Sequence, residues 1–386
     1  MTVTLITETK ELDKLCKKLA KEPFITLDTE FLREKTYHPQ LCLVQIGGKK
    51  DRAAIDPLAE GIDMQSLLDL LANPKVLKVL HAARQDLEIF FRMMGQSPAP
   101  LFDTQIAAQV LGMGDNLGYQ NLVAKTLDIQ IDKGQQFTDW SRRPLSDSQL
   151  EYAIGDVVHL YDAYLIMMKD LLKRGRDMWL VEEMESLTKP EMHYVEPDQA
   201  WKRIRSRLKR PQQMGWLRQL AAWREDTAQE RNVPRVRILR DDALVELATN
   251  LPKSEDRMRS TRAFPQHLKS DLRHELWKLC EALPELPESE WIEPIKKKRI
   301  SATTEGRLEM LRLLMKQNTR EHDVSASFIC NRDGLEDFAS GDYAEDHPLL
   351  HGWRFEVFGK DAVDLMQGKR AAILDPKTGD IRFKEI

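Results

Sequence analysis

Two acidic residues, Asp28 and Glu30, end an apolar run near the N-terminus of this 386-residue chain. The run spans residues 24–31 (FITLDTEF), and a strand there places the two carboxylates side by side on one face. Carboxylates that close raise each other's pKa unless a cation lies between them. The pair therefore favours a site for a divalent metal ion, which prefers hard oxygen ligands. A strand that simply ends in solvent is the competing interpretation.

A second acidic element follows a buried strand. In the segment LHAARQDLE (residues 80–88) the strand ends at His81 and a helix begins near Arg84, which places Asp86 in the first helical turn. That position lies above the carboxyl edge of the sheet, where open α/β sheets bind ligands. The helix dipole alone also favours an acid there, so Asp86 by itself leaves both interpretations open.

A third element combines a tyrosine and an aspartate one helical turn apart. Ser146 and Gln149 form a capping box, which predicts the start of a helix. Tyr152 and Asp156 then share one face of that helix at spacing i, i+4. Taken alone, the pair is also compatible with a solvent-facing acid beside a half-buried tyrosine.

The elements that must position these residues change in type along the chain. Short connections between early strands predict an antiparallel meander, and strands that then alternate with helices predict parallel pairing in an α/β layer sandwich. Asp103 is predicted to cap the next helix, and His81 is assigned a structural role. After Gly118 the pattern is helical to about residue 192. Strands are expected at residues 3–6, 24–31, 41–46, 53–56, 76–81 and 101–102, and helices at 64–71, 84–94 and 104–111.

Composition indicates a globular protein of two or three domains. The chain is 42% hydrophobic and 31% charged, with a net charge of −4. Its four cysteines form no CxxC or Cys/His pairing, which excludes a zinc or disulfide framework and fits a reducing compartment. The N-terminus has no basic region followed by an apolar one, and no run approaches about 18 apolar residues. We therefore expect a cytoplasmic protein without a membrane partner.

The second half of the chain contains an internal repeat. Residues 202–210 include six basic residues and no acidic residue. We interpret this stretch as a linker or as the first basic turn of a new domain. An offset of 91 aligns Leu244 with Leu335 and Ile238 with Ile329, among other pairs, so we predict a duplicated helical module. Residues 284–301 are expected to be a second linker, and residues 371–383 a hairpin. The expected domains span residues 1–195, 208–288 and 300–386.

Together the three acidic elements form an ordered pattern, with D-x-E on an early strand, an aspartate opening a middle helix, and Y-x-x-x-D on a late helix. This pattern resembles the DEDD exonuclease superfamily, tyrosine branch. The surroundings (FITLDTEFLREKTYHP, LHAARQDLE, FDTQIAAQVLG and LSDSQLEYAIGDVVHLYDAY) and the helical repeats resemble the ribonuclease D family over essentially the whole chain. The resemblance implies an α/β ribonuclease-H-like catalytic domain, a mixed sheet with flanking helices. Two small all-α modules of the helicase-and-RNase-D C-terminal (HRDC) type follow, the second degenerate.

The resemblance also implies a two-metal-ion mechanism. Asp28, Glu30, Asp86 and Asp156 would hold two divalent ions, Mg²⁺ or Mn²⁺, and Tyr152 would orient the attacking water. In the family pattern Asp28 bridges both ions, Glu30 and Asp156 complete the first site, and Asp86 reaches the second, partly through water. The expected reaction is 3′→5′ exonucleolytic release of 5′-mononucleotides. The expected substrate is RNA with a free 3′ end, such as precursor tRNA, and the expected state is a monomer.

Substrate contacts are expected around the mouth of the site. Phe31 could stack on a terminal base, although an aromatic residue there also fits a core. The stretch before the last catalytic helix could contact phosphates or could be a solvated loop; its candidates are Lys133, Gln136, Trp140, Arg142 and Arg143. Basic residues between 202 and 240, interleaved with Trp216 and Trp223, fit a nucleic-acid grip, with the tryptophans also explained as core.

Two alternative functions stay open. A DNA 3′→5′ exonuclease is one, because no residue in the sequence reads the 2′-hydroxyl. A non-catalytic nucleic-acid-binding protein is the other, and the loss of a metal carboxylate would be its mark. None of the four carboxylates is missing, which argues against it.

Overall fold

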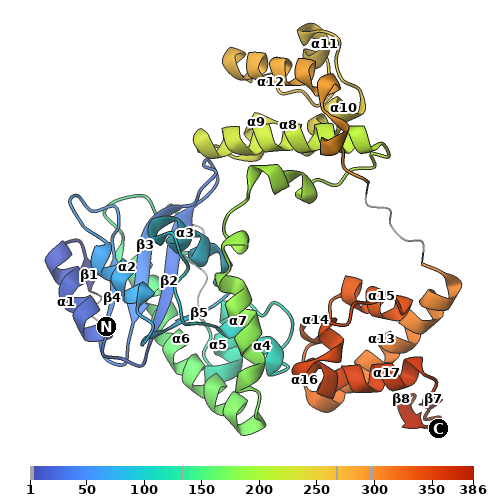
Figure 1. Ribbon diagram of the computed structural model, residues 1–386. Helices are drawn as coiled ribbons and strands as arrows, with labels where there is room; N and C mark the ends of the chain where they lie inside the picture. The colour runs from blue at the N-terminus through green and yellow to red at the C-terminus, as the bar shows by residue number, and fades with distance from the viewer. Residues whose placement is uncertain (1–3, 132–133, 137, 267, 295–299) are drawn as a thin grey trace.

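The computed structural model describes residues 4–131, 134–136, 138–266, 268–294 and 300–386. Three parts form an open arc in Figure 1. We call them the sheet domain (residues 5–188), the first helical module (residues 197–282) and the second helical module (residues 302–385). Val3, the first residue of the expected first strand, lies outside the described residues.

The sheet domain is built on a six-stranded mixed sheet in the order β1-β4-β3-β2-β5-β6. Strands β2, β3 and β4 pair antiparallel, which confirms the expected meander. Strands β5 and β6 continue parallel to β2, and β1 pairs parallel with β4. The strands are β1 (Leu5–Ile6), β2 (Phe24–Leu32), β3 (Gln40–Gly47), β4 (Arg52–Ile55), β5 (Leu77–Leu80) and β6 (Leu101–Asp103).

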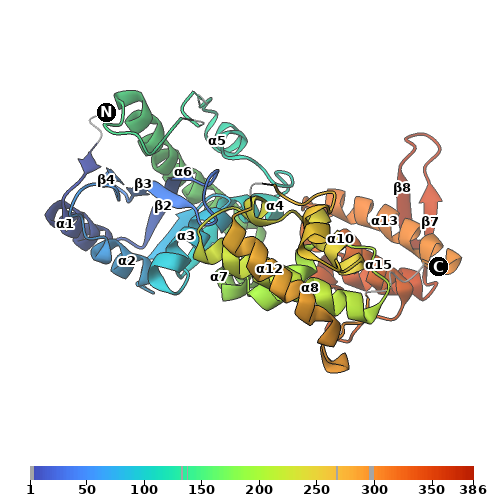
Figure 2. The ribbon, with the colours of Figure 1, turned by 90° about the horizontal axis from the view of Figure 1, so that it is seen from above.

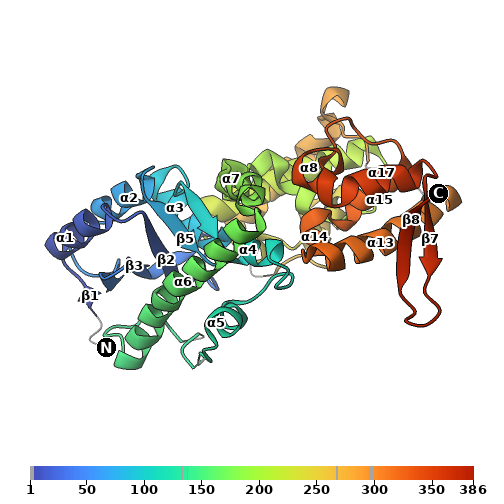
Figure 3. The ribbon, with the colours of Figure 1, turned by 90° about the horizontal axis from the view of Figure 1, so that it is seen from below.

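The two faces of the sheet are covered by different helices. Alternation along β2 buries Ile25 and Leu27 in one core with α1, α2 and α3, whereas Phe24 packs in the core of α4 and α6. Asp28 and Glu30 therefore face α6, the long helix that lies along the sheet in Figure 3. The helices are α1 (Thr9–Leu19), α2 (Gln65–Ala72), α3 (Arg84–Met94), α4 (Thr104–Val110), α5 (Tyr119–Leu127), α6 (Asp147–Arg174), η1 (Asp177–Leu180), α7 (Val181–Thr188) and η2 (Pro190–Met192).

The positions of the helices in the two helical modules confirm the predicted repeat. Helices α9 and α10 of the first module recur in the second as α14 and α15, displaced by the predicted 91 residues at both ends. The long helices α8 and α13 each lead into a residue with positive φ, Asn232 at 49° and Asp323 at 47°, at equivalent positions. The first module contains η3 (Pro197–Arg203), α8 (Pro211–Glu230), α9 (Arg235–Ile238), α10 (Asp241–Thr249), α11 (Glu255–Arg259) and α12 (Ser270–Ala282), followed by η4 (Leu283–Glu285) and η5 (Glu288–Glu290).

The second module departs from the repeat after α15. It continues through η6 (Pro348–Leu350), α16 (Gly352–Arg354), a π-helical turn η7 (Phe355–Gly359) and α17 (Lys360–Met366). The chain then forms the expected hairpin, β7 (Arg370–Leu374) antiparallel to β8 (Ile381–Glu385). The elements that match the first module are α13 (Ala302–His322), α14 (Ala326–Ile329) and α15 (Arg332–Ser340).

Both helical modules dock on the sheet domain. Tyr37, in the loop after β2, is buried in the hydrophobic core of the first module. On the other side, Trp179 of η1 stacks on Trp353 of α16 with ring centroids 4.5 Å apart, and one continuous core joins the two parts. Figure 2 shows α4 beside the second module from above. Among the described helices, none is both long and apolar enough to cross a membrane.

Candidate metal centre and active site

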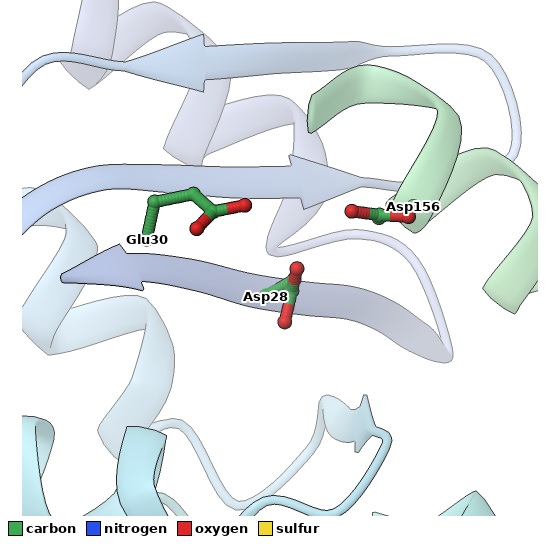
Figure 4. A group of neighbouring side chains, drawn as sticks. All are labelled: Asp28, Glu30 and Asp156. Atoms are coloured by element: carbon green, nitrogen blue, oxygen red, sulfur yellow. The ribbon is translucent and has the colours of Figure 1, made fainter. Parts of the chain in front are cut away.

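Three carboxylates from two elements meet on the α6 face of the sheet. Asp28 and Glu30 project from β2, and Asp156 projects toward them from α6 (Figure 4). One carboxylate oxygen of each lies within 4.8 Å of the others. Helix α6 is fixed over the strand because the Thr26 hydroxyl donates to the Val157 carbonyl oxygen at 2.8 Å. The predicted capping box of Ser146 and Gln149 starts this helix.

The fourth predicted carboxylate, Asp86, reaches β2 from the opposite layer. Strand β5 ends at Leu80 while β2 continues to Leu32, so the edge of β2 beyond β5 is open to the first turn of α3. There the Thr29 hydroxyl donates to Oδ1 of Asp86. Asp86 lies outside the group of three carboxylates but is close enough to raise the pKa of Asp28 and Glu30 electrostatically.

Burial and mutual repulsion make these carboxylates hold protons tightly. Burial raises the pKa of Glu30 to about 8, with further contributions from Asp156 and Asp86. Burial also raises the pKa of Asp156 to about 7, and that of Asp86 to about 7 against the opposing hydrogen bond from Thr29. The pKa of Asp28 is raised well above its usual value by burial and by the other three acids. A divalent cation on these hard oxygen donors would relieve the repulsion, so the residues fit a metal site.

Tyr152 stands one turn before Asp156 and faces the same group. Burial, followed by the charges of Asp156 and Glu30, raises the pKa of its phenol. The hydroxyl therefore stays protonated at neutral pH and can donate a hydrogen bond, whereas it cannot serve as a base. Its ring lies 6.2 Å from that of Trp140, centroid to centroid.

Two residues next to the site, Thr29 and Tyr119, were not predicted from the sequence. Thr29 was visible only as the middle residue of D-x-E, and strand alternation points it away from the two carboxylates. Tyr119 opens α5 and donates its hydroxyl to the backbone carbonyl oxygen of Asp156. The only sequence signal for Tyr119 is its place directly after Gly118, which serves as N-cap of α5.

The predicted substrate contacts lie in different environments. Phe31 is partly exposed beyond a register shift at the end of β2, and Arg142 has a side chain 83% exposed. Trp140 is only 2% exposed, so its ring could stack on RNA only after this loop moved. Arg143 is held to Asp56 at 2.6 Å. Gln136 is exposed, and Lys133 lies outside the described residues.

Asp103 and His81 support the loop that leads into α3. Asp103 accepts hydrogen bonds from the backbone amides of Gln105, Ala82 and Ala83, which confirms its predicted capping role and ties it to the neighbouring loop. Nδ1 of His81 lies 2.9 Å from the Thr104 hydroxyl. Both residues thus hold the backbone that presents Asp86.

Comparison with known proteins places this chain in a family. A family model described as 3'-5' exonuclease matches residues 3–172. The chain is 43% identical over 371 residues to a ribonuclease D of Sphingobium indicum, with 95% of each chain covered. The chain belongs to the ribonuclease D family. A ribonuclease D of Nitrobacter hamburgensis is 42% identical over 377 residues, covering 96% of this chain and 97% of that relative.

Other comparisons agree with this membership in the ribonuclease D family. A model described as the HRDC domain matches residues 213–283, within the first helical module. The crystal structure of Escherichia coli RNase D, described as an exoribonuclease involved in structured RNA processing, superimposes with a TM-score of 0.81 at 29% identity. The match covers 95% of this chain and 99% of that one. The expected fold class, a ribonuclease-H-like domain followed by HRDC-type modules, is confirmed.

Proposed function

We propose that this chain is a metal-dependent 3′→5′ exoribonuclease that releases 5′-mononucleotides from RNA with a free 3′ end, precursor tRNA among them. The observation that carries the proposal is the convergence of carboxylate oxygens of Asp28, Glu30 and Asp156 within 4.8 Å of one another. Asp86 and Tyr152 lie close enough to interact electrostatically with this group. The group of carboxylates is assembled within one chain without residues from a second copy, and we propose that the protein acts as a monomer.

The carboxylates would divide two cations between them. Asp28, whose pKa is raised by all three other acids, would contribute to both sites; Glu30 and Asp156 would complete one site, and Asp86 the other. When bound, two Mg²⁺ or Mn²⁺ ions supply charge that lowers the pKa of a water molecule and stabilises the departing 3′ oxygen. The Tyr152 hydroxyl, protonated at neutral pH, would donate a hydrogen bond that orients the attacking water.

The relatives of this chain and its exposed basic residues support RNA as the substrate. The relatives are named ribonuclease D, and the E. coli structure is that of an enzyme of structured RNA processing. All six basic residues between 202 and 210 are exposed, where the sheet domain leads into the first helical module. Clustered exposed cations bind phosphates without regard to sequence. Phe31 and Arg142, both solvent-accessible, are proposed contacts for the 3′-terminal nucleotides, with Lys133 and Trp140 as further candidates.

Degradation of a 5′-labelled RNA with a single-stranded 3′ tail tests the proposal. We expect a ladder that shortens from the 3′ end in Mg²⁺ or Mn²⁺ and disappears in chelator. Asp28→Ala should abolish it, whereas the matched control Asp162→Asn, an exposed acid on α6, should not. A 3′-labelled DNA strand in the same tube separates a DNA exonuclease from an RNA exonuclease. RNA that is bound but never shortened would instead indicate a non-catalytic binding protein.

A further inference from the structure

Gln45, in the middle of β3, has a buried amide that the fold leaves unused. The residue is 0% exposed. Within the described part of the chain, neither Oε1 nor Nε2 of Gln45 has a hydrogen-bond partner. Burying an amide without partners costs free energy, and nearly all buried polar groups are therefore paired. A methionine or leucine would fill the same space without that cost, so the presence of an amide at this buried position requires an explanation.

The register of the sheet places Gln45 directly beside Asp28. On one side Gln45 pairs with Asp28 of β2, and on the other with Ala54 of β4. Residues directly opposite in antiparallel strands point to the same face, with Cβ atoms about 4.5–5.5 Å apart. The three side chains thus form one row across the sheet, and the methyl group of Ala54 can neither donate nor accept a hydrogen bond.

Helix α6 closes the space above this row. Thr26 lies on the same face of β2 and bonds to the Val157 carbonyl oxygen at 2.8 Å, which holds α6 close to the strands. A Cβ atom at Gly47, two residues from Gln45 on β3, would lie 3.5 Å from Val157. The amide is therefore enclosed between β3 and α6, and within its row the polar neighbour it can reach is the Asp28 carboxylate.

We propose that Gln45 is a positioning residue for Asp28: its Nε2 donates to the Asp28 carboxylate when that carboxylate holds a divalent cation. The inference rests on the proposed function, because it needs Asp28 to be a metal ligand. Partners behind metal ligands fix the orientation of the ligand, and their loss typically weakens metal binding about 10- to 100-fold. This explains why an amide is buried directly beside Asp28, although it has no hydrogen-bond partner within the described residues. The competing explanation is a permanently bound internal water.

Gln45→Met tests the assignment in the full-length protein. Methionine keeps the length of the side chain and removes the amide. We expect the affinity for Mn²⁺, measured by calorimetry, to fall about 10- to 100-fold. The melting temperature without metal should stay the same or rise, because an unpartnered buried amide is lost. The matched control is Gln219→Met in the first helical module, which removes a bond to Glu290 at 2.9 Å and should leave Mn²⁺ affinity unchanged.

A second measurement uses the wild-type protein. The side-chain amide resonance of Gln45 should shift when Mg²⁺ is added, and should not shift in Asp28→Ala. Unchanged Mn²⁺ affinity in Gln45→Met, or an amide resonance indifferent to Mg²⁺, would overturn the inference. A Gln45→Met protein that is unfolded or less stable without metal would also overturn it, in favour of the internal water. Absence of Mn²⁺ binding by the wild type would instead overturn the metal assignment itself.

Discussion

The hydroxyl of Thr29 donates to the carboxylate of Asp86, across 57 residues of sequence. Thr29 lies between Asp28 and Glu30 on β2, but alternation along the strand points it to the other side of the sheet. One short stretch of strand therefore presents two carboxylates to α6 and holds a third, from α3, at its open edge. The hydrogen bond also opposes the effect of burial on the pKa of Asp86.

Thr29→Val should weaken metal binding without unfolding the protein. Valine has the shape of threonine, but it removes the hydrogen bond that favours the charged form of Asp86. We expect the affinity for Mg²⁺ to fall roughly 10-fold in a calorimetric titration. Thr126→Val, which removes a hydroxyl bond within α5, is the control and should leave that affinity unchanged. Equal affinities in the two variants would show that Thr29 does not support Asp86.

As pH rises, the affinity for Mg²⁺ should increase, whereas the stability of the metal-free protein should decrease. The pKa of Glu30 is raised from 4.5 to about 8, so the folded metal-free protein holds this proton more tightly than the unfolded chain. The stabilisation from Glu30 is complete below about pH 4.5 and is lost as pH rises through about 8. Mg²⁺ competes with the same protons, so its affinity should rise between pH 6 and 8.

Glu30→Gln isolates this effect. Thermal unfolding without metal, followed from pH 5 to pH 9, should show a smaller loss of stability with pH in Glu30→Gln than in wild type. The sign follows from the direction of the pKa shift, because glutamine has no proton to lose. Identical pH profiles for the two proteins would mean that Glu30 titrates near its ordinary pKa in the folded state.

Tyr152→Phe should impair turnover and spare metal binding. Phenylalanine keeps the ring that packs near Trp140 and removes the only donor that Tyr152 offers. Loss of one well-placed donor in an active site lowers kcat roughly 10²-fold. Tyr161→Phe on the same helix is the control, since its ring stacks on Phe24 with centroids 4.5 Å apart, away from the carboxylates. Full activity of Tyr152→Phe would remove this residue from the proposed mechanism.

The sequence predicted those features that depend on local pattern. The strand of Asp28, the capped start of α6 and the repeat at an offset of 91 all follow from periodicity, capping residues and alignment of the chain with itself. The contacts of Thr29, Tyr119 and Gln45 could not be predicted, because each depends on which strand or helix lies opposite. Trp140 illustrates the same limit. An aromatic residue in this loop suggested a contact with substrate, but its neighbours in the fold bury it in a hydrophobic core.

Exposed arginines before α8 should contribute to RNA affinity through charge alone. Arg205→Gln with Arg207→Gln should weaken RNA binding equally for different sequences. The slope of log K against log salt should fall by roughly 1 for each arginine. Binding is measured in chelator, where no turnover takes place. Lys14→Gln with Lys17→Gln, on the exposed side of α1, is the control and should leave the slope unchanged. An equal slope in both double variants would place the RNA path elsewhere.

A buried polar contact between Tyr37 and Glu225 holds the first helical module to the sheet domain. The contributions of these two side chains to stability should be strongly coupled. The Tyr37 hydroxyl donates to Glu225, which is 0% exposed, and Arg235 donates to the same carboxylate at 2.7 Å. A hydrogen bond to a buried charge contributes about 1.5–3 kcal/mol. A double-mutant cycle of Tyr37→Phe and Glu225→Gln, read by chemical unfolding, should give a coupling of that size.

The comparison pair is Arg231 and Asp271, whose side chains are 34% and 51% exposed. Water screens such a pair, so alanine substitutions there should give a coupling of about 0–1 kcal/mol. If the buried pair coupled no more strongly than the exposed one, Tyr37 would pack in the first module without anchoring it. A large coupling would mean that the loop directly after the metal-binding strand and the first HRDC-type module are held in one fixed arrangement.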